Sequence, residues 1–538
     1  MTLLKKLSLI LICLSLIVLS TFVITSCGSE NYEDGILYNG TAVIGADKEA
    51  EELTVKDGTT SIAAGAFSDC KKLTSLTIPD SVTEIAGGAF DGCDALIKTE
   101  GGVNYVDGWA VGADRNATDI SVKDGTRGIV REAFVGLTSL KTVTVPASVK
   151  HIGARAFFRC SAIEKITLPF IGKSISSKTG MHFGYIFGAF NREQNSEYVP
   201  ESLKEVNVTS CTEIADYAFS GCNKISVITL PDSLKSIGAN AFSGCTALGE
   251  IIIPDSVTDI GEKAFYKCSA LTTVKLPENS AFTSIPEYTF AYCSSITKMT
   301  IPASVKEIGA CAVARCLNLE ELKFKGESID RIGQQAFDGC KYISEVNLTV
   351  KTLGKAAFQN CIGLTDVTLG DGTVEIESYA FNGCSGIVNF SMPESVTKIG
   401  EYSFYACYSM TSITLGKSIK AIESYTFQNC INLKEFVIPS SVTSVGEDAF
   451  SGCNALVERV DGISYVDGWI VDIQPSVTSI EIGDGVRGFA VGAFSDAINL
   501  AEIRLFVNAE KWQIIEATIP TSIRQEINVI SNTDKDNQ

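Results

Sequence analysis

Apolar residues recur along most of this chain in one short pattern. A representative copy covers residues 241–261, and its Leu248, Ile251 and Ile253 follow an L-x-x-I-x-I spacing. The last two have the period of two that a strand with one buried face requires. Pro254 cannot donate a hydrogen bond to a ladder, so we expect the strand to end there. Each copy therefore predicts one short strand.

The rest of the copy predicts turns around that strand. Asp255-Ser256 has turn chemistry, and Val257 and Ile260 form a second short apolar pair. Gly261 lets the chain turn again, and Ala264-Phe265 begins a helical turn whose ring points inward. One copy is too small to bury its apolar face, whereas stacked copies form one continuous core. The pattern therefore predicts a solenoid.

The copies are in phase over most of the chain. The commonest interval is 23 residues, as from Phe219 to Phe242 and on to Phe265. The repeat ring stands at residues 67, 90, 134, 157, 219, 242, 265, 290, 337, 358, 381, 404, 427, 450 and 494, and Val313 takes its place once.

These copies resemble the leucine-rich repeats of the BspA-like (Treponema pallidum-type) class, from about residue 60 to about residue 505. The consensus of that class is close to A-F-x-x-C-x-x-L-x-x-I-x-L-P-x-S-V-x-x-I-G. The resemblance implies an α/β, β-dominated leucine-rich-repeat solenoid with a parallel β-sheet on one face. It also implies a protein on the surface of a bacterium or a protist, with adhesion to host extracellular-matrix proteins or to other microbes as its role.

Three inserts interrupt the repeat. Residues 102–109 and 462–469 are nearly identical, and each carries Asp-Gly between apolar alternations, which predicts a β-hairpin. Residues 36–43 are a third version with Asn-Gly. The longest insert, residues 169–208, is rich in Gly and aromatic residues. It is either packing over the core, which we favour, or a binding feature.

The first residues predict a location outside the cytoplasm. Lys5 and Lys6 precede an apolar stretch that closes on Thr25-Ser26-Cys27. Small residues before a cysteine resemble the bacterial lipobox, in which the cysteine is lipidated. We therefore expect Cys27 to carry a lipid that attaches the chain to a bacterial membrane, its only contact with a membrane, with the rest of the chain at the cell surface. The alternative is an uncleaved membrane-spanning segment.

These features predict the following organisation: a lipoprotein signal peptide at 1–26, a tether and N-terminal hairpin at 27–50, the solenoid at 51–507 with inserts at about 98–123, 169–208 and 458–481, a C-terminal cap at 508–530 and a polar tail at 531–538.

Most of the 18 cysteines also recur once per copy, so they would form a ladder of sulfurs along the stack, here called the cysteine ladder. Fourteen stand three residues after the repeat ring position, and only the copies with Leu137 and Ala497 lack one. Stacked cysteines have parallel Cα–Cβ vectors, which suit a disulfide poorly. No C-x-x-C pair points to zinc. We expect free buried thiols and no metal site, with disulfides as the alternative. Cys211 and Cys311 lie outside this ladder and stay unassigned.

Composition narrows the function. The formal charge of −19 argues against nucleic acid, because phosphate binding needs a positive field. The chain has only two histidines, His151 and His182, and no motif of a hydrolase, nucleotide-binding loop or zinc protease. We therefore predict no catalytic residues, no cofactor and no enzymatic activity.

The exposed strand face is the better functional surface. In the representative copy it carries Glu250 and Ile252. The same positions in other copies are often Thr, which also suits any exposed strand. Acidic residues on three successive copies would form an acidic strip that could bind a basic protein or a cation. A nearby lysine would offset part of its negative charge. The predicted binding face is Glu321, Lys323, Glu345, Asn347, Asp366 and Thr368.

The sequence thus predicts a lipid-anchored, non-enzymatic surface protein that binds a protein partner on its strand face. A structural surface scaffold without a specific ligand is one alternative. A polysaccharide-binding lipoprotein is another, although the exposed strand positions contain no aromatic platform. A protist surface protein is a further alternative, against which the lipobox argues.

Overall fold

The structure, a computed structural model, describes residues 32–175 and 179–531, which fall in two compact units divided after Ile97. The predicted signal peptide and Cys27 lie outside the described residues, as do residues 532–538 of the predicted tail.

The first unit begins with a hairpin of β1 (Ile36–Asn39) and β2 (Ala42–Ala46). The strand β2 pairs in parallel with β4 (Ser61–Ile62), which pairs with β6 (Glu84–Ile85), while β3 (Glu52–Thr54) pairs with β5 (Ser75–Thr77). The rings of Phe67 and Phe90 stack with their centroids 5.7 Å apart. The antiparallel pairing of β1 with β2 confirms the N-terminal hairpin predicted from Asn-Gly.

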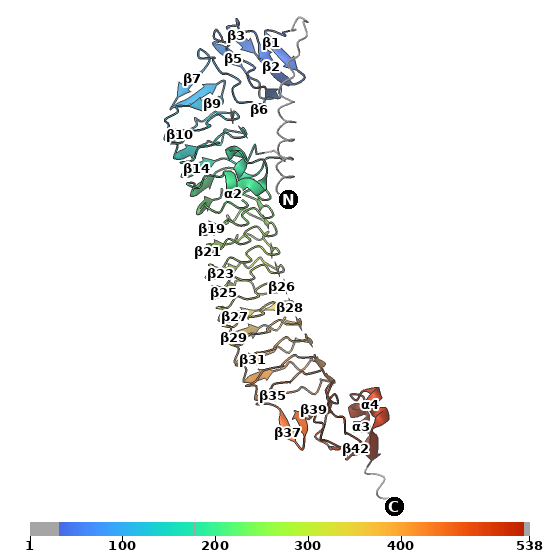
Figure 1. The fold of residues 1–538 in the computed structure, drawn as a ribbon. Coiled ribbons are helices and arrows are strands. Elements are labelled where there is room, and N and C mark those ends of the chain that lie inside the picture. The colour runs from blue at the N-terminus through green and yellow to red at the C-terminus, as the bar shows by residue number, and fades with distance from the viewer. Residues whose placement is uncertain (1–31, 176–178, 532–538) are drawn as a thin grey trace, which may run out of the picture. The chain divides into compact units, whose positions relative to one another are not determined.

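The second unit contains the predicted strands as a ladder of parallel strands, here called the first ladder, which confirms the solenoid (Figure 1). It consists of a nine-stranded sheet followed by a five-stranded sheet. The strands of the nine-stranded sheet are β10 (Asp119–Ser121), β12 (Thr142–Thr144), β14 (Lys165–Leu168), β15 (Glu205–Val208), β17 (Val227–Thr229), β19 (Glu250–Ile252), β21 (Thr273–Lys275), β23 (Lys298–Ile301) and β25 (Glu321–Phe324). Those of the five-stranded sheet are β27 (Glu345–Leu348), β29 (Asp366–Leu369), β31 (Asn389–Ser391), β33 (Ser412–Thr414) and β35 (Glu435–Val437).

A second ladder of shorter parallel strands runs beside the first. The sequence predicted only a short apolar pair here, such as Val257 and Ile260, because strands of two residues are too short to show a period. Most of its strands, in chain order, are β11 (Gly128–Ile129), β13 (His151–Ile152), β16 (Glu213–Ile214), β18 (Ser236–Ile237), β20 (Asp259–Ile260), β22 (Ser284–Ile285), β24 (Glu307–Ile308), β26 (Ile329–Ile332), β28 (Val350–Leu353), β30 (Glu375–Ile376), β32 (Lys398–Ile399), β34 (Ala421–Ile422) and β36 (Ser444–Val445).

The turn between the second ladder and the repeat ring is not helical, so the predicted helical turn at Ala264-Phe265 is wrong. Lys263 and Lys267 have φ values of 58° and 60°, and residues in this left-handed conformation interrupt a helix. The Phe265 N–H instead donates to the Thr289 carbonyl of the next turn at 2.9 Å. Gly261 serves close packing, because a Cβ there would lie 2.3 Å from the backbone nitrogen of Ala239.

Both Asp-Gly inserts are the predicted hairpins. One has β7 (Lys98–Glu100), β8 (Val103–Val106) and β9 (Trp109–Ala113), and the other has β37 (Glu458–Val460), β38 (Ile463–Val466) and β39 (Trp469–Ile473). Asp107 and Gly108 have φ values of 40° and 76°, as a tight hairpin turn requires. The last hairpin strands pair in parallel with β11 and β41 (Gly488–Phe489), so each hairpin continues the second ladder.

The long insert supplies a complete turn of the core. It contains the 3₁₀ helices η1 (Phe183–Phe187) and η2 (Arg192–Gln194) and the helix α2 (Asn195–Tyr198). The rings of Phe183 and Phe219 lie 5.0 Å apart, and those of Phe187 and Phe157 lie 6.4 Å apart. Both insert rings are buried, which confirms the packing interpretation for them.

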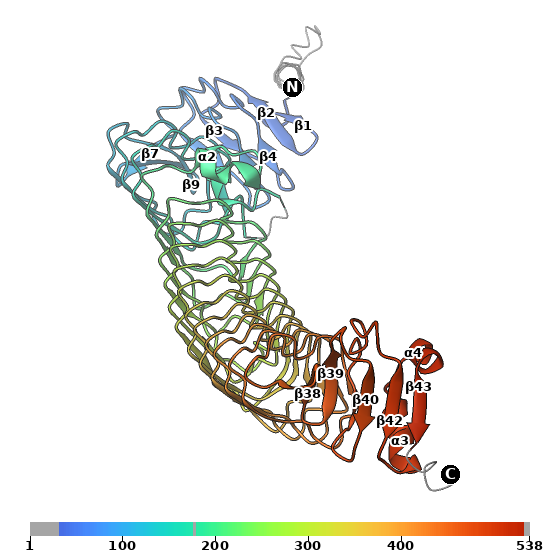
Figure 2. The same ribbon diagram turned by 60° about the horizontal axis from the view of Figure 1, so that its bottom comes forward.

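The last turns have a core of their own. There β40 (Ser479–Ile482), β42 (Glu502–Leu505) and β43 (Asn528–Ser531) form a parallel sheet, flanked by α3 (Ala509–Glu516) and α4 (Thr521–Glu526) (Figure 2). Ile515 and Ile519 are buried in this smaller core, and Trp512 packs against it.

The main core is a double column of rings and sulfurs. The rings of Phe242 and Phe265 stack with centroids 5.0 Å apart and planes 3° apart. Every described cysteine is buried with a free thiol, which confirms the predicted burial. The Cys245 thiol donates to the carbonyl of Phe219 in the preceding turn at 3.2 Å, and the contact recurs at ten further thiols of the ladder with the matching Phe and at Cys340 with Val313.

The two unassigned cysteines lie beside this column. Cys211 follows β15 and is buried in the main core. Cys311 packs against Ala291 and Ala314 in a small separate cluster.

Candidate binding face

The first ladder has one buried and one exposed row of side chains. On β19, Ile251 is buried, while Glu250 and Ile252 are exposed, as the period of two predicts. The same alternation appears on the strands that carry the predicted binding residues. Glu321 and Lys323 lie on β25, Glu345 and Asn347 on β27, and Asp366 and Thr368 on β29.

Glu321 does not act as an independent negative charge. Its carboxylate lies 2.9 Å from Lys298 Nζ and forms a second ion pair with Lys323. Hydrogen bonds from Lys323 and Lys298, together with their charges, lower the pKa of Glu321 to about 2. The predicted acidic strip therefore narrows to the two carboxylates on β27 and β29.

Those two carboxylates stand side by side. Glu345 is the register partner of Asp366, and Asn347 is the partner of Thr368. Asp366 accepts a hydrogen bond of 2.8 Å from the Thr365 hydroxyl. Glu345 and Asp366 form no ion pair with any residue that the structure describes. The four side chains make a compact polar patch next to the lysines of β23 and β25.

The backbone ladder is interrupted inside this predicted face. The strand β25 ends the nine-stranded sheet and β27 begins the five-stranded one, so these neighbours are not paired. The second ladder continues past this point, because β24, β26, β28 and β30 belong to one sheet. Glu321 and Lys323 therefore lie on one side of the interruption, and the other four predicted residues lie on the other side.

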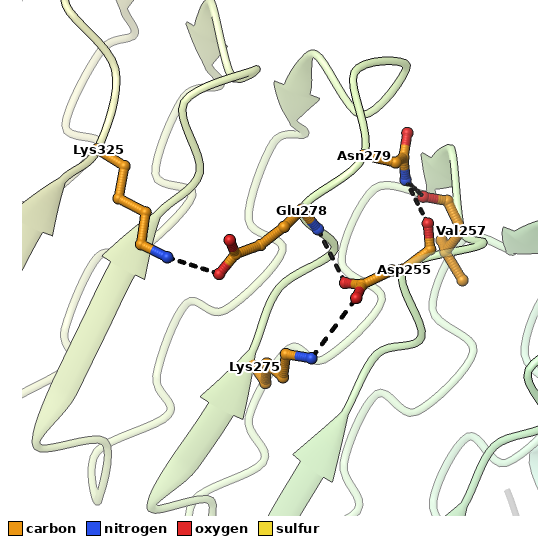
Figure 3. A network of polar contacts seen from close by, with 6 residues as sticks. All are labelled: Asp255, Val257, Lys275, Glu278, Asn279 and Lys325. Carbon is orange, nitrogen blue, oxygen red and sulfur yellow. Dashed lines mark hydrogen bonds and ion pairs between the residues drawn. The ribbon is translucent and has the colours of Figure 1, made fainter.

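A charged network borders the face and occupies the neighbouring lysines (Figure 3). Lys325 Nζ donates to Glu278 Oε1 at 2.6 Å, and the Glu278 backbone N–H donates to Asp255 Oδ1 at 3.0 Å. Lys275, an exposed residue of β21, lies 3.7 Å from Asp255 Oδ2. These groups tie successive turns together, so we assign them to stability.

The groups that could carry nucleophilic chemistry are shielded. Burial lowers the pKa of both His151 and His182, and the His151 ring stacks on Trp109 with centroids 6.3 Å apart. Burial raises the pKa of the Cys160 thiol to about 11 and that of Cys316 to about 12, which suppresses the reactive thiolate.

No group of three or more His, Cys, Asp or Glu side chains within residues 32–175 and 179–531 is arranged to hold a metal ion. Over the same ranges, no helix has the length and apolar character needed to cross a bilayer.

Sequence reasoning missed an aromatic surface outside the strand face. The rings of Tyr379, Tyr402 and Tyr425 stack across three turns, with centroid separations of 4.7 Å and 4.5 Å. They occupy one repeat position, two residues before the repeat Phe, so a column-by-column reading of the copies could have found them. All three are half-buried.

Comparisons with known proteins agree on the repeat. The family described as BspA type leucine-rich repeat region matches in six copies, over residues 46–107, 111–182, 212–344 and 332–457. A search of the curated proteins gives no match.

Among solved structures, the chain is similar to a leucine-rich repeat protein from Bacteroides ovatus, with 24% identity over 76% of this chain and 97% of that one, and a TM-score of 0.44. A leucine-rich repeat protein from Eubacterium ventriosum is 21% identical over 65% of this chain and 86% of that one, with a TM-score of 0.35. A leucine-rich cell surface protein from Faecalibacterium prausnitzii is 22% identical over 78% of this chain and 97% of that one, with a TM-score of 0.32.

Proposed function

This chain belongs to the BspA-type leucine-rich repeat family, and from that premise we propose that it is a non-enzymatic binding protein of the cell surface. Members of this family are often surface proteins, and leucine-rich repeat proteins generally mediate contacts between proteins. In the proposal, the first ladder holds a protein partner, such as a host matrix protein or another cell-surface protein. The shielding of both histidines and of the buried thiols supports a role without catalysis.

The observation that carries this proposal is the exposed row of the first ladder. Its side chains project from parallel strands that are fixed by a packed core, and a site on rigid strands needs little ordering when a partner binds. The patch of Glu345, Asp366, Asn347 and Thr368 is the part of this row where two carboxylates without ion pairs stand directly opposite each other on paired strands. It would recognise a basic or hydrogen-bonding surface on the partner.

Binding of purified matrix proteins to the immobilised chain tests this function. The double variant Glu345→Gln/Asp366→Asn keeps the shape of the patch and removes its charge, and we expect it to weaken binding about fivefold or more. Glu250→Gln is the matched control, because Glu250 occupies the same exposed strand position on β19. We expect the control to bind within about twofold of the wild type.

Two outcomes of this experiment would contradict the proposal. If no matrix protein binds saturably at physiological salt, the chain is better explained as a surface scaffold. If a glycan array gives saturable binding and the proteins do not, the polysaccharide-binding alternative is favoured.

The proposed attachment depends on Cys27, which lies outside the described residues. We propose that the mature chain begins at Cys27 with a diacyl- or triacylglyceryl group that holds it to the membrane. Mass spectrometry of the mature N-terminus tests this directly. An intact Met1 would contradict the lipid anchor, whereas binding by the strand face would be unaffected.

A further inference from the structure

The chain places a cation over tyrosine rings at one position of its repeat. Tyr217 and Tyr288 both stand two residues before the repeat Phe, with φ values of 59° and 55°. The Arg192 guanidinium lies 3.7 Å from the centroid of Tyr217, and Lys263 Nζ lies 5.0 Å from that of Tyr288. Lys263 itself occupies the same repeat position one turn earlier. A cation at these distances from a ring face is attracted by its quadrupole.

In the stack of Tyr379, Tyr402 and Tyr425, only the first ring has a cation over it. Lys355 Nζ lies 5.7 Å from the centroid of Tyr379. Beyond Tyr425, the next residue at the same repeat position is Asp448, with a φ value of 52°. No lysine or arginine of the described residues lies over the rings of Tyr402 or Tyr425.

Negative charge lies along the two turns of the stack that have no cation, those of Tyr402 and Tyr425. Glu401, Glu447 and Asp448 are exposed and form no ion pair within the described chain. Glu447 is the largest cause of a raised pKa at Tyr425, and burial, Glu447 and Asp472 raise the pKa of Asp448. No lysine or arginine of the described chain is among the causes of the shift at Asp448, so no nearby cation there compensates the charge of this carboxyl.

The end of the stack that has no cation opens onto a concave space. Glu447 and Asp448 line a cavity of about 400 Å³, together with Asp472 and Asp496. Arg459 also lines it, so the lining combines four carboxylates with one guanidinium. The surface therefore offers room as well as charge for a basic side chain.

We propose that the acidic tyrosine patch, defined as Tyr379, Tyr402, Tyr425, Glu401, Glu447 and Asp448, is a docking surface for a lysine- or arginine-rich segment of a partner protein. One basic side chain of that segment lies over the ring of Tyr425 on the side of the next turn, opposite the stacked ring of Tyr402. Others meet the remaining carboxylates along the neighbouring turns. A polypeptide fits better than a single small cation, because the acceptors extend over successive turns rather than converging on one point. This surface is separate from the strand face and does not depend on the function proposed above.

Fluorescence anisotropy with the full chain and a labelled peptide of alternating arginine and serine tests the proposal. A peptide with glutamine in place of arginine is the neutral reference. We expect saturable binding of the arginine peptide, weakening as salt is raised, and little binding of the glutamine peptide. In Glu447→Gln/Asp448→Asn the affinity should fall about fivefold to tenfold.

Two further variants sharpen the test. Asp448→Lys places the chain's own cation in the turn after Tyr425, on the side of the ring opposite Tyr402, so this cation should occupy the site and reduce binding by about tenfold or more. Lysine is compatible with this backbone, since Lys263 has a φ value of 58° at the same position. Glu287→Gln is the matched control, because Glu287 precedes Tyr288, which already has its cation, and binding should stay within about twofold.

Several outcomes would overturn the inference. Wild-type affinity in the Glu447→Gln/Asp448→Asn variant, with an unchanged circular dichroism spectrum, would do so. Equal binding of the neutral peptide would do so as well, as would spermine or a neutral oligosaccharide binding more tightly than the arginine peptide. A loss of peptide binding in Glu345→Gln/Asp366→Asn, but not in the patch variants, would assign the peptide to the strand face and leave the proposed function standing.

Discussion

At the scale of single residues, the cysteine column explains why a thiol suits this position. The Phe219 carbonyl accepts the backbone N–H of Cys222 in its own turn at 3.0 Å and the thiol of Cys245 in the next turn at 3.2 Å. A thiol is small, largely apolar and a weak donor, so it fills the core and satisfies the second lone pair of a buried carbonyl. Alanine would leave that contact unmade, and a larger apolar residue would crowd the ring column.

These thiols predict a loss of stability at alkaline pH. An unfolded thiol has a pKa near 9.0, whereas burial raises the pKa of folded Cys316 to about 12. The folded state therefore keeps protons that the unfolded state releases, and this stability is complete below about pH 9 and is lost as the pH rises toward the folded value. Urea unfolding under reducing conditions at about pH 8 and about pH 10.5 should give a lower midpoint at the higher pH. Cys316→Ala should reduce the difference between the two midpoints, and an equal difference in wild type and variant would contradict this assignment.

At the scale of elements, the repeat predicted its strands better than its connections. The L-x-x-I-x-I spacing specified the first ladder because each copy repeats the same buried positions, and Asp-Gly specified the hairpins. The second ladder was missed because its pairs, such as Asp259–Ile260, are too short to reveal a period. The prediction of a helical turn at Ala264-Phe265 was wrong because the left-handed conformation of Lys263 is imposed by hydrogen bonds to the next turn. The local sequence does not reveal those hydrogen bonds.

The sequence predicted only part of the binding face. Exposure of Glu345 and Asp366 follows from alternation, but the neutralisation of Glu321 depends on Lys298, a residue of the neighbouring turn whose side-chain direction the pattern does not fix. The tyrosine stack was not predicted because Tyr379, Tyr402 and Tyr425 lie in turns outside the strands, although they share one repeat position.

The glycine between the second ladder and the ring turn supports a prediction about close packing. In Gly261→Ala the new Cβ would lie 2.3 Å from the Ala239 nitrogen, so two backbones must separate. We expect the free energy of unfolding to fall by about 1–3 kcal/mol. Gly483→Ala is the control, because nothing lies within 4 Å of a Cβ there, and its effect should stay within about 0.5 kcal/mol. Equal urea midpoints for the two variants would contradict the close-packing role.

At the scale of the whole molecule, stability is shared between neighbouring turns. One hydrophobic cluster in the second unit extends from Val103 to Ala490, and a smaller cluster covers the last turns. In a stack of this kind, each turn is held by the turns on both sides of it, and an end turn lacks one neighbour. The polar and charged contacts between turns, such as those in Figure 3, add to this coupling but are mostly exposed.

This organisation predicts a gradient of backbone opening along the second unit. Amides of β19 to β33 should exchange with deuterium more slowly than those of β42 and β43, because the middle turns open only with their neighbours. Hydrogen exchange followed by mass spectrometry, corrected for the intrinsic rate of each peptide, measures this directly. Uniform protection from β19 to β43 would indicate a single cooperative unit and contradict the nearest-neighbour description.

The interruption between β25 and β27 gives the second unit an uneven resistance to bending. One ladder lacks its backbone bonds at that point, while the other keeps them through β26 and β28. A force that bends the solenoid so that the first ladder opens would therefore part β25 from β27 before it parts the paired strands, with the second ladder as the pivot. The distance between Lys323 and Asn347 would then change, so a partner bound on both sides of the interruption would have its binding site altered by the load.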